Sequence, residues 1–338
     1  MLKQGFKWMF LILGTIIGAG YASGRELWQF FGEESGLALL LFTIIFIICC
    51  QVIMSISFQL KTNQFYPLLI EVFGKRWAFL YDSLIIFYLF STTVIMIAGG
   101  GATLETFQLP YWLGIMTFSL LIILVFIRGI QGMLSINSYI MPVLVIGLIS
   151  VLLFFILKSQ HILDIDWRHQ HNWSSGFTFT ALNILPLVAV LTTIGNEIKT
   201  KVEIHIASIG SGLLIGGLSF VYNESLLQVS DLLPDYEIPL FAIMKSFPFF
   251  MLIIMSILLL VAIYTTAVSG ILGLTTRFRR NENTSLWKMA IIFVIIMIPF
   301  TKLGFSKLIA VLYPLYGMVN LFLLAALLVY PIRNIYKN

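Results

Sequence analysis

The amino-acid sequence predicts an all-α polytopic membrane protein with ten transmembrane helices, of which the first and the sixth are discontinuous. Three observations support this fold class. The chain is far more apolar than a soluble protein, its apolar residues fall into ten stretches long enough to cross a bilayer, and glycine or proline interrupts two of those stretches. The ten spans divide into two halves of five, which predicts a 5+5 inverted repeat.

Composition places the chain in the membrane class. Of its 338 residues, 59% are hydrophobic and only 10% are charged, and the mean hydropathy is +1.00. A soluble domain carries about 25% charged residues. The net charge of +5 does not indicate nucleic acid as a partner, because the basic residues lie in short loops between apolar stretches. Cys49 and Cys50 are adjacent inside one apolar run, where we expect them to pack as small hydrophobic residues.

The first span, residues 5–31, carries the strongest functional signal. Its glycines stand at Gly14, Gly18, Gly20 and Gly24. Glycine costs about 1 kcal/mol relative to alanine inside a helix, and freed backbone groups are tolerated at membrane depth only beside protein or a water-filled cavity. We therefore expect a helix broken between about Ile17 and Tyr21, with its backbone groups directed at a solute.

Two other interpretations of this segment stay open. The small residues Gly14, Gly18 and Ser23 are also typical of close packing between membrane helices. Lys3 and Lys7, followed by an apolar core and small residues, are also typical of a secretory signal peptide. Against a signal peptide, an aromatic-rich segment follows directly, and no soluble domain comes after it.

The other nine spans are assigned because about 20 apolar residues cross the hydrocarbon core. They lie near residues 37–60, 78–102, 112–128, 137–157, 177–196, 204–222, 247–275, 286–301 and 306–331. No loop between them is long enough to form a separate domain, so we expect one transmembrane domain over residues 1–338. The first repeat covers about 5–157 and the second about 177–331.

The sixth span contains the second predicted interruption. Pro186 removes a backbone donor and disfavours helix at the preceding residue, and Thr180 and Asn183 place polar groups just before it. We expect a break near residues 183–186, at a depth similar to that of the first break. Paired interruptions in corresponding spans of two halves indicate a transporter binding site.

The positive charges predict the orientation in the membrane. With the N-terminus in the cytoplasm, fourteen of the 20 Lys and Arg residues fall inside and six fall outside. The inside set is Lys3, Lys7, Lys61, Lys75, Arg76, Arg128, Lys199, Lys201, Arg277, Arg279, Arg280, Lys288, Arg333 and Lys337. The outside set is Arg25, Lys158, Arg168, Lys245, Lys302 and Lys307. An even number of spans then places both termini of this cell-membrane protein in the cytoplasm.

The segment Gly14-Thr-Ile-Ile-Gly-Ala-Gly-Tyr-Ala-Ser-Gly-Arg-Glu-Leu-Trp-Gln-Phe-Phe31 resembles the first helix of the YkvI-type membrane proteins of Gram-positive bacteria. Those proteins are members of the amino acid–polyamine–organocation (APC) superfamily, with a LeuT-like fold. The Gly18-Ala19-Gly20 core resembles the superfamily motif in which unwound backbone holds the carboxylate of an amino acid. The resemblance is specific in the first helix and loose elsewhere.

The candidate substrate-binding residues lie at the two predicted interruptions and on the third span. They are Thr15, Gly18, Ala19, Gly20, Tyr88, Thr180 and Asn183. Tyr88 corresponds to a helix-three tyrosine that lies over the substrate in the superfamily, although an ordinary packing role for this aromatic residue stays open.

A coupling-ion site is implied in the same way. LeuT-like sodium carriers hold one sodium between helices one and eight, and on this chain the ligand pattern falls on Gly14, Ile17, Ala262, Thr265 and Thr266. Oxygen ligands suit a hard cation. Alternatively, the two threonine hydroxyls bond the carbonyl four residues back or pack against a neighbouring helix. Span five contains no Lys or Arg where proton-driven relatives often carry a lysine, which favours sodium over proton coupling.

Charged residues near the ends of spans are candidates for gating. Arg25 and Glu26 follow the break on the outer half-helix, where they either gate the outer mouth or face water. Asp82 lies about one turn into the third span from the cytoplasmic side, where it gates or pairs with Lys75 or Arg76. An intramembrane acid is a functional hypothesis by default.

The sequence therefore predicts a secondary transporter of a small solute, an amino acid or a related carboxylate or zwitterion, coupled to sodium and working by alternating access. The alternative is a membrane receptor that binds a solute without moving it, as in the germinant-permease-like proteins of the same superfamily. The chain carries no HExxH, no GxSxG and no nucleotide-binding loop, so we expect neither an enzyme nor ATP drive. The expected partners are a small-molecule substrate and the lipid bilayer, with no nucleic acid, no nucleotide and no cofactor besides the sodium ion.

Overall fold

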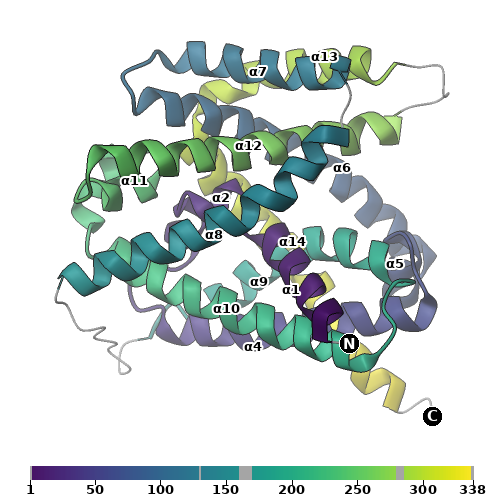
Figure 1. The fold of residues 1–338 in the computed structure, drawn as a ribbon. Helices are drawn as coiled ribbons and strands as arrows, with labels where there is room; N and C mark the ends of the chain where they lie inside the picture. The colour runs from purple at the N-terminus through teal and green to yellow at the C-terminus, as the bar shows by residue number, and fades with distance from the viewer. Residues whose placement is uncertain (1, 129–130, 160–169, 279–284, 336–338) are drawn as a thin grey trace.

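The first span is broken in the computed structural model, which describes residues 2–128, 131–159, 170–278 and 285–335 (Figure 1). It consists of α1 (Leu2–Ile16), α2 (Ala19–Ala22) and α3 (Arg25–Phe30). At the first break the N–H of Gly18 donates to the Ile16 carbonyl at 2.7 Å, and a regular bond resumes from Ala22 to Gly18 at 2.9 Å. The predicted break is therefore confirmed at residues 17–18, and the chain turns again at 23–24.

Each of the other nine predicted spans coincides with a helix. These are α4 (Gly36–Leu60), α6 (Lys75–Glu105), α7 (Tyr111–Arg128), α8 (Gln131–Ser159), α9 (Ser175–Leu191), α10 (Lys201–Leu227), α12 (Phe249–Phe278), α13 (Leu286–Met297) and α14 (Phe305–Ile335). Shorter elements connect or extend them: α5 (Tyr66–Phe73), η1 (Thr192–Ile194), η2 (Ser230–Asp235), α11 (Pro239–Met244) and η3 (Ile298–Leu303). Among the described residues, seven helices are long and apolar enough to cross a membrane, and Tyr111–Ile127 and Pro142–Lys158 are shorter apolar helices. The count of ten spans stays a prediction.

The expected break in the sixth span is wrong. α9 runs from Ser175 to Leu191 with Pro186 inside it, and the chain leaves α-helical geometry only at η1. Proline removes a single backbone donor, so the hydrogen bonds on either side hold the helix together. The Asn183 side chain bonds within the same helix, because its Nδ2 donates to the Phe179 carbonyl at 2.8 Å. The two halves therefore do not share an interruption at corresponding places.

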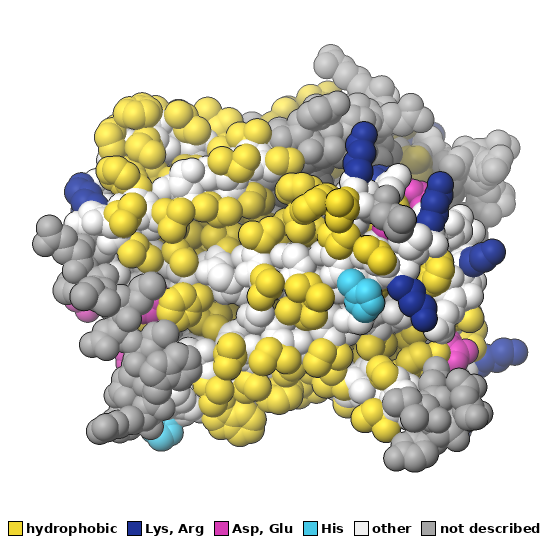
Figure 2. All heavy atoms as spheres, turned by 60° about the horizontal axis from the view of Figure 1, so that its bottom comes forward, with side chains coloured by type: hydrophobic (Ala, Val, Ile, Leu, Met, Phe, Trp, Pro, Cys, Tyr) yellow, Lys and Arg dark blue, Asp and Glu magenta, His cyan; other side chains and the backbone are white. Residues whose placement is uncertain are grey.

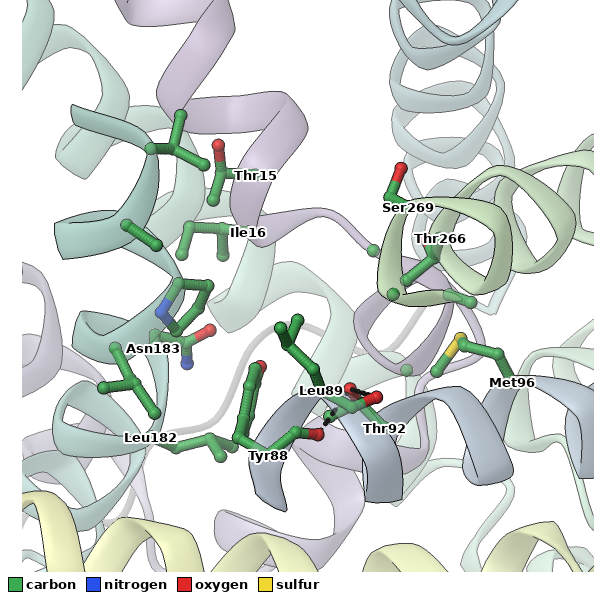
Figure 3. A pocket seen from close by; sticks show the side chains of 18 of the residues that line it. Thr15, Ile16, Tyr88, Leu89, Thr92, Met96, Leu182, Asn183, Thr266 and Ser269 are labelled. Carbon is green, nitrogen blue, oxygen red and sulfur yellow. Dashed lines mark hydrogen bonds between the residues drawn. The ribbon is translucent and has the colours of Figure 1, made fainter. Parts of the chain in front are cut away.

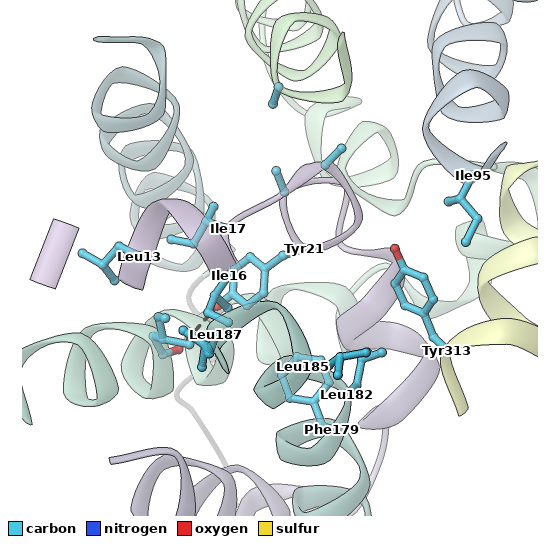
Figure 4. Close-up of a cluster of buried hydrophobic side chains, with 14 of the residues drawn as sticks. Leu13, Ile16, Ile17, Tyr21, Ile95, Phe179, Leu182, Leu185, Leu187 and Tyr313 are labelled. Atoms are coloured by element: carbon cyan, nitrogen blue, oxygen red, sulfur yellow. Dashed lines mark hydrogen bonds between the residues drawn. The ribbon is translucent and has the colours of Figure 1, made fainter. Parts of the chain in front are cut away.

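The broken span lies in the middle of the bundle. α1 packs against α10 and α9, and α9 also packs against α4 and α14. Phe30 and Phe31 contact Phe179 with ring centroids 5.3 and 4.9 Å apart, and Phe42 of α4 joins the same cluster. Figure 4 shows buried side chains of the first span beside those of α9. The freed backbone of the break therefore faces protein and a cavity rather than lipid, as a membrane requires.

The helix contacts follow the pattern that an inverted repeat would give. The contact of α1 with α10 corresponds to that of α9 with α4 when the halves are exchanged, and α6–α7 corresponds to α12–α13. The division at about 5–157 and 177–331 itself stays a prediction.

The outer surface is suited to a bilayer. Figure 2 shows hydrophobic side chains across the middle of one face, while Lys and Arg gather toward one edge of it. The start of α1 and the end of α14 lie at the same end of the bundle (Figure 1), as an even number of spans requires. The identity of that side stays a prediction, and Arg168, Arg279, Arg280 and Lys337 lie outside the described residues.

Candidate functional site

A cavity of about 260 Å³ adjoins the break in the first span. The first span forms one wall, and α6, α9, α12 and α14 form the others, so helices distant in the sequence meet here (Figure 3). The wall is largely apolar. Its uncharged polar side chains belong to Thr15, Tyr88, Thr92, Asn183, Thr266, Ser269 and Tyr313.

Three glycines of the first span have different structural roles. An added Cβ at Gly18 would meet no atom within 4 Å, because this residue faces the cavity. A Cβ at Gly20 would overlap the Glu26 carboxylate and lie 2.8 Å from its Cδ. Gly24 adopts φ +78°, a conformation that favours glycine, and its Cβ would lie 2.7 Å from the Tyr222 hydroxyl oxygen. Close packing between helices therefore does not account for Gly18.

Six of the seven predicted substrate residues line this cavity. They are Thr15, Gly18, Ala19, Gly20, Tyr88 and Asn183. Thr180 is not among the lining residues, and its fully buried hydroxyl donates to the Gly176 carbonyl at 2.6 Å. The hydroxyl of Thr15 likewise donates within its own helix, to the Leu11 carbonyl at 2.8 Å.

Tyr88 stands in a polar row on α6. The Thr92 hydroxyl donates to the Tyr88 carbonyl at 2.7 Å, and the Ser91 hydroxyl is hydrogen-bonded to the Tyr316 hydroxyl. The rings of Tyr88 and Tyr316 meet edge to face with centroids 5.2 Å apart. Figure 3 shows Tyr88 pointing toward Asn183 across the cavity. α14 therefore fixes the face of α6 that carries Tyr88.

The predicted sodium ligands lie on two helices that border the same region. Thr266 lines the cavity and Thr265 is buried just behind it. Both hydroxyls donate to the Ala262 carbonyl, at 3.1 Å from Thr265 and 2.8 Å from Thr266. Thr266 thus bonds the carbonyl four residues back as expected, Thr265 bonds the one three residues back, and the three oxygens lie together. On the first span, the N–H that would bond the Gly14 carbonyl in a continuous helix belongs to Gly18 and donates to Ile16 instead.

The three gating candidates lie in different surroundings. Asp82 forms an ion pair with Arg277 of α12, so its partner is neither Lys75 nor Arg76. Arg25 is half-buried, and its Nε has no hydrogen-bond partner in the described part of the chain. Glu26 is only 7% exposed and lines the cavity itself, so it belongs to the binding region rather than facing water.

Comparison with known proteins identifies the family. No family model matches the chain. It is 50% identical over 335 residues to the uncharacterized protein YyaD of Bacillus subtilis (strain 168), covering 99% of each chain. The chain belongs to the YyaD family. It is also 28% identical over 334 residues to the uncharacterized membrane protein YkvI of the same organism, covering 94% of each chain.

The solved structures with similar folds are transporters rather than enzymes. The crystal structure of MhsT in complex with L-phenylalanine matches with a TM-score of 0.66 at 16% identity, over 93% of this chain and 87% of MhsT. The Eremococcus coleocola manganese transporter matches at 0.61 and 14%, over 97% and 78%. A sodium-coupled sialic acid symporter matches at 0.51 and 14%, over 94% and 84%. The chain therefore has the LeuT-like fold.

Sequence reasoning missed several residues of the cavity wall in this YyaD-family fold. Leu89 and Met96 of α6, Ser269 of α12 and Tyr313 of α14 all line it. Their helices are hydrophobic on most faces, so no periodicity distinguishes the inner face. For Glu26 a signal existed, because it is the acid inside the first span.

Proposed function

We propose that the chain is a secondary transporter that carries a small solute, an amino acid or a related carboxylate or zwitterion, across the cell membrane by alternating access. The observation that supports this most is the cavity beside the broken first helix. Solute sites in such carriers lie where discontinuous helices free their backbone groups near mid-membrane. Membership of the APC superfamily is part of the proposal, supported by the similarity to YkvI and by the fold.

The size and lining of the cavity support a solute smaller than a drug molecule. Pockets for drug-sized ligands measure about 300–1,000 Å³, and this cavity measures about 260 Å³. Apolar residues with a few placed polar groups bind the body of a solute and fix its orientation. Here the Tyr88 hydroxyl and the Asn183 amide are the side-chain groups available for that purpose on α6 and α9.

Sodium is the coupling ion in this proposal, held by the carbonyls of Gly14, Ile17 and Ala262 and the hydroxyls of Thr265 and Thr266. The convergence of both hydroxyls on the Ala262 carbonyl supports it, since rotating them toward an ion would exchange two neutral hydrogen bonds for ion ligation. The Gly14 carbonyl supports it as well, because the Gly18 N–H that would bond this carbonyl in a continuous helix donates to Ile16 instead. Oxygen donors are the ligands that a hard cation prefers.

In alternating access, ion and solute stabilise one conformation in proportion to their preference for it. Because the ion ligands and the cavity wall share the first span, we expect each ligand to strengthen the binding of the other. Both termini are expected in the cytoplasm, on the basis of the charge bias of the loops.

Uptake into proteoliposomes tests the proposal. Purified full-length protein is reconstituted, and the twenty proteinogenic amino acids are supplied with an inward sodium gradient, with an equal choline gradient as the control. We expect at least one amino acid to accumulate with sodium only. Accumulation that is equal in choline would refute sodium coupling, and binding without any uptake would favour the germinant-permease type of receptor.

A further inference from the structure

Glu26 lies in the wall of the cavity and is the acid that has no role in the proposed transport cycle. It lies in the first turn of α3, and the residue is 7% exposed. Lys, Arg and His are missing from the lining residues of the cavity in the described part of the chain. As far as the chain is described, the cavity therefore has one carboxyl group and no basic side chain in its wall.

Among the residues that the structure describes, no basic side chain pairs with Glu26. Within the described residues, the ion pairs join Lys7 to Glu197 and Arg277 to Asp82. The neighbouring residue Arg25 lies near a different acid, Glu237. A carboxylate removed from water without a positive partner costs several kcal/mol or more, so buried acids are paired or serve a function.

The carboxylate is held in a fixed position. The Tyr313 hydroxyl of α14 lies close to it in the wall of the same cavity. On the other side it packs against Gly20, where any Cβ would overlap it. The charge of Glu26 also acts on Tyr88, so the acid lies near the aromatic groups of both α6 and α14. These contacts orient the carboxyl group toward the cavity, and no basic side chain among the described residues pairs with it.

We propose that the Glu26 carboxylate receives the ammonium group of the transported solute, so that the cavity selects solutes that carry a primary amine. This inference rests on the proposed transporter function and names the chemical class of its substrate. An ammonium group has three donors and accepts no hydrogen bond. Glu26 supplies a carboxylate acceptor, and the rings of Tyr88 and Tyr313 supply aromatic groups that attract a cation.

The same geometry argues against a divalent metal as the occupant. Calcium takes six to eight oxygen ligands and magnesium about six, whereas the acidic side chains of this wall amount to one carboxylate in the described residues. No group of three or more His, Cys, Asp or Glu in the described residues could hold a metal ion. An organic cation needs fewer charged ligands, because aromatic and hydroxyl groups complete its surroundings.

The test compares three matched sets of probes on purified full-length protein: the twenty proteinogenic amino acids, their deaminated 2-hydroxy acids, and their decarboxylated amines. Thermal stabilisation measures binding to wild type, Glu26→Gln, Glu26→Asp and Glu33→Gln. Glu33 is an exposed acid of the same segment and serves as the control. Size-exclusion profiles report whether each variant is folded.

We expect wild type and Glu33→Gln to bind one or more amino acids and to ignore the corresponding 2-hydroxy acids. Loss of one partner of a buried charge pair weakens binding roughly 30-fold or more, so Glu26→Gln should bind those amino acids at least that much more weakly. Glu26→Asp keeps the charge on a shorter side chain and should retain part of the affinity, which separates charge recognition from misfolding.

Equal binding of 2-hydroxy acids and amino acids by wild type would overturn the inference and leave the transporter proposal intact. Unchanged amino-acid affinity in folded Glu26→Gln would also overturn it. If the uptake by this variant has in addition lost its dependence on pH, Glu26 carries a proton instead. If wild type binds and transports no probe of any set, the proposed function itself fails.

Discussion

Gly18 and Gly24 lie on the same broken span, yet alanine at the two positions should have opposite consequences. At Gly18 the backbone is extended, with φ −81° and ψ −175°, and an added Cβ meets no atom within 4 Å. Alanine adopts this conformation without strain and restricts the unfolded chain. We therefore expect the free energy of unfolding to change by less than about 1 kcal/mol.

At Gly24 the geometry is unfavourable for any side chain. The left-handed conformation, φ +78°, costs alanine about 1–2 kcal/mol. The new Cβ would lie 2.7 Å from the Tyr222 hydroxyl oxygen, and that hydroxyl donates to the Ala22 carbonyl at 3.0 Å. Displacing Tyr222 adds the loss of one buried hydrogen bond, about 0.5–1.5 kcal/mol. The sum predicts a destabilisation of about 1.5–3.5 kcal/mol.

Two measurements on purified protein separate these effects. Thermal unfolding should be unchanged for Gly18→Ala and clearly earlier for Gly24→Ala. Solute binding should be weakened in Gly18→Ala, because the added methyl group projects into the cavity, and Gly18→Leu should abolish it. If Gly18→Ala destabilises the protein as much as Gly24→Ala does, the close-packing interpretation of this segment is correct. If both Gly18 variants bind the solute with wild-type affinity, Gly18 does not lie at the solute.

Three further predictions concern the ion, the ion pair and the topology. Sodium at 100 times its dissociation constant should stabilise wild type by about 2.7 kcal/mol; Thr265→Val and Thr266→Val should each reduce this response, while an equal response to choline would disprove the site. Asp82→Asn should cost about 1–3 kcal/mol, since Asp82 is 12% and Arg277 54% exposed in their side chains; a double-mutant cycle with Arg277→Gln that gives no coupling would contradict this. Lys288→Cys should react with impermeant maleimide from the cytoplasmic side only, without removal of the buried native cysteines, and labelling in intact cells would reverse the topology.

The fold was predictable because the bilayer restricts what an apolar chain can do. Every backbone group must be satisfied internally, so ten apolar stretches imply helices, and each expected stretch is helical in the described chain. The conformational freedom of glycine disfavours a continuous helix in the first span, and the break lies where the glycines cluster. Pro186 was a weaker signal, since it deletes one donor only and α9 continues through it.

The candidate site was predictable only where the chain itself is unusual. Thr15, Gly18, Ala19 and Gly20 follow from the glycine pattern, and all four line the cavity. Tyr313 could not be found, because the long apolar sequence of α14 does not reveal which face turns inward. The sequence predicts that Glu26 gates the outer mouth or faces water, because a half-helix is expected to continue outward after the break. The positive φ of Gly24 instead turns the chain, and the carboxylate returns to Gly20.

This turn connects the ion, the solute and the motion of the first span. Two of the proposed sodium ligands, Gly14 and Ile17, lie at or just after the end of α1, whereas Glu26 lies on α3. Short segments without continuous helical bonding separate the two. A sodium ion would bind the carbonyl oxygens at the end of α1, and an ammonium group would bind the Glu26 carboxylate on α3. The two ligands would therefore act on different segments of the first span. Ligands change a conformational equilibrium only through different affinities for its states. We therefore expect α1 and α3 to move relative to each other when the sodium ion and the ammonium group bind, with Gly24 and the 17–18 break as the hinges.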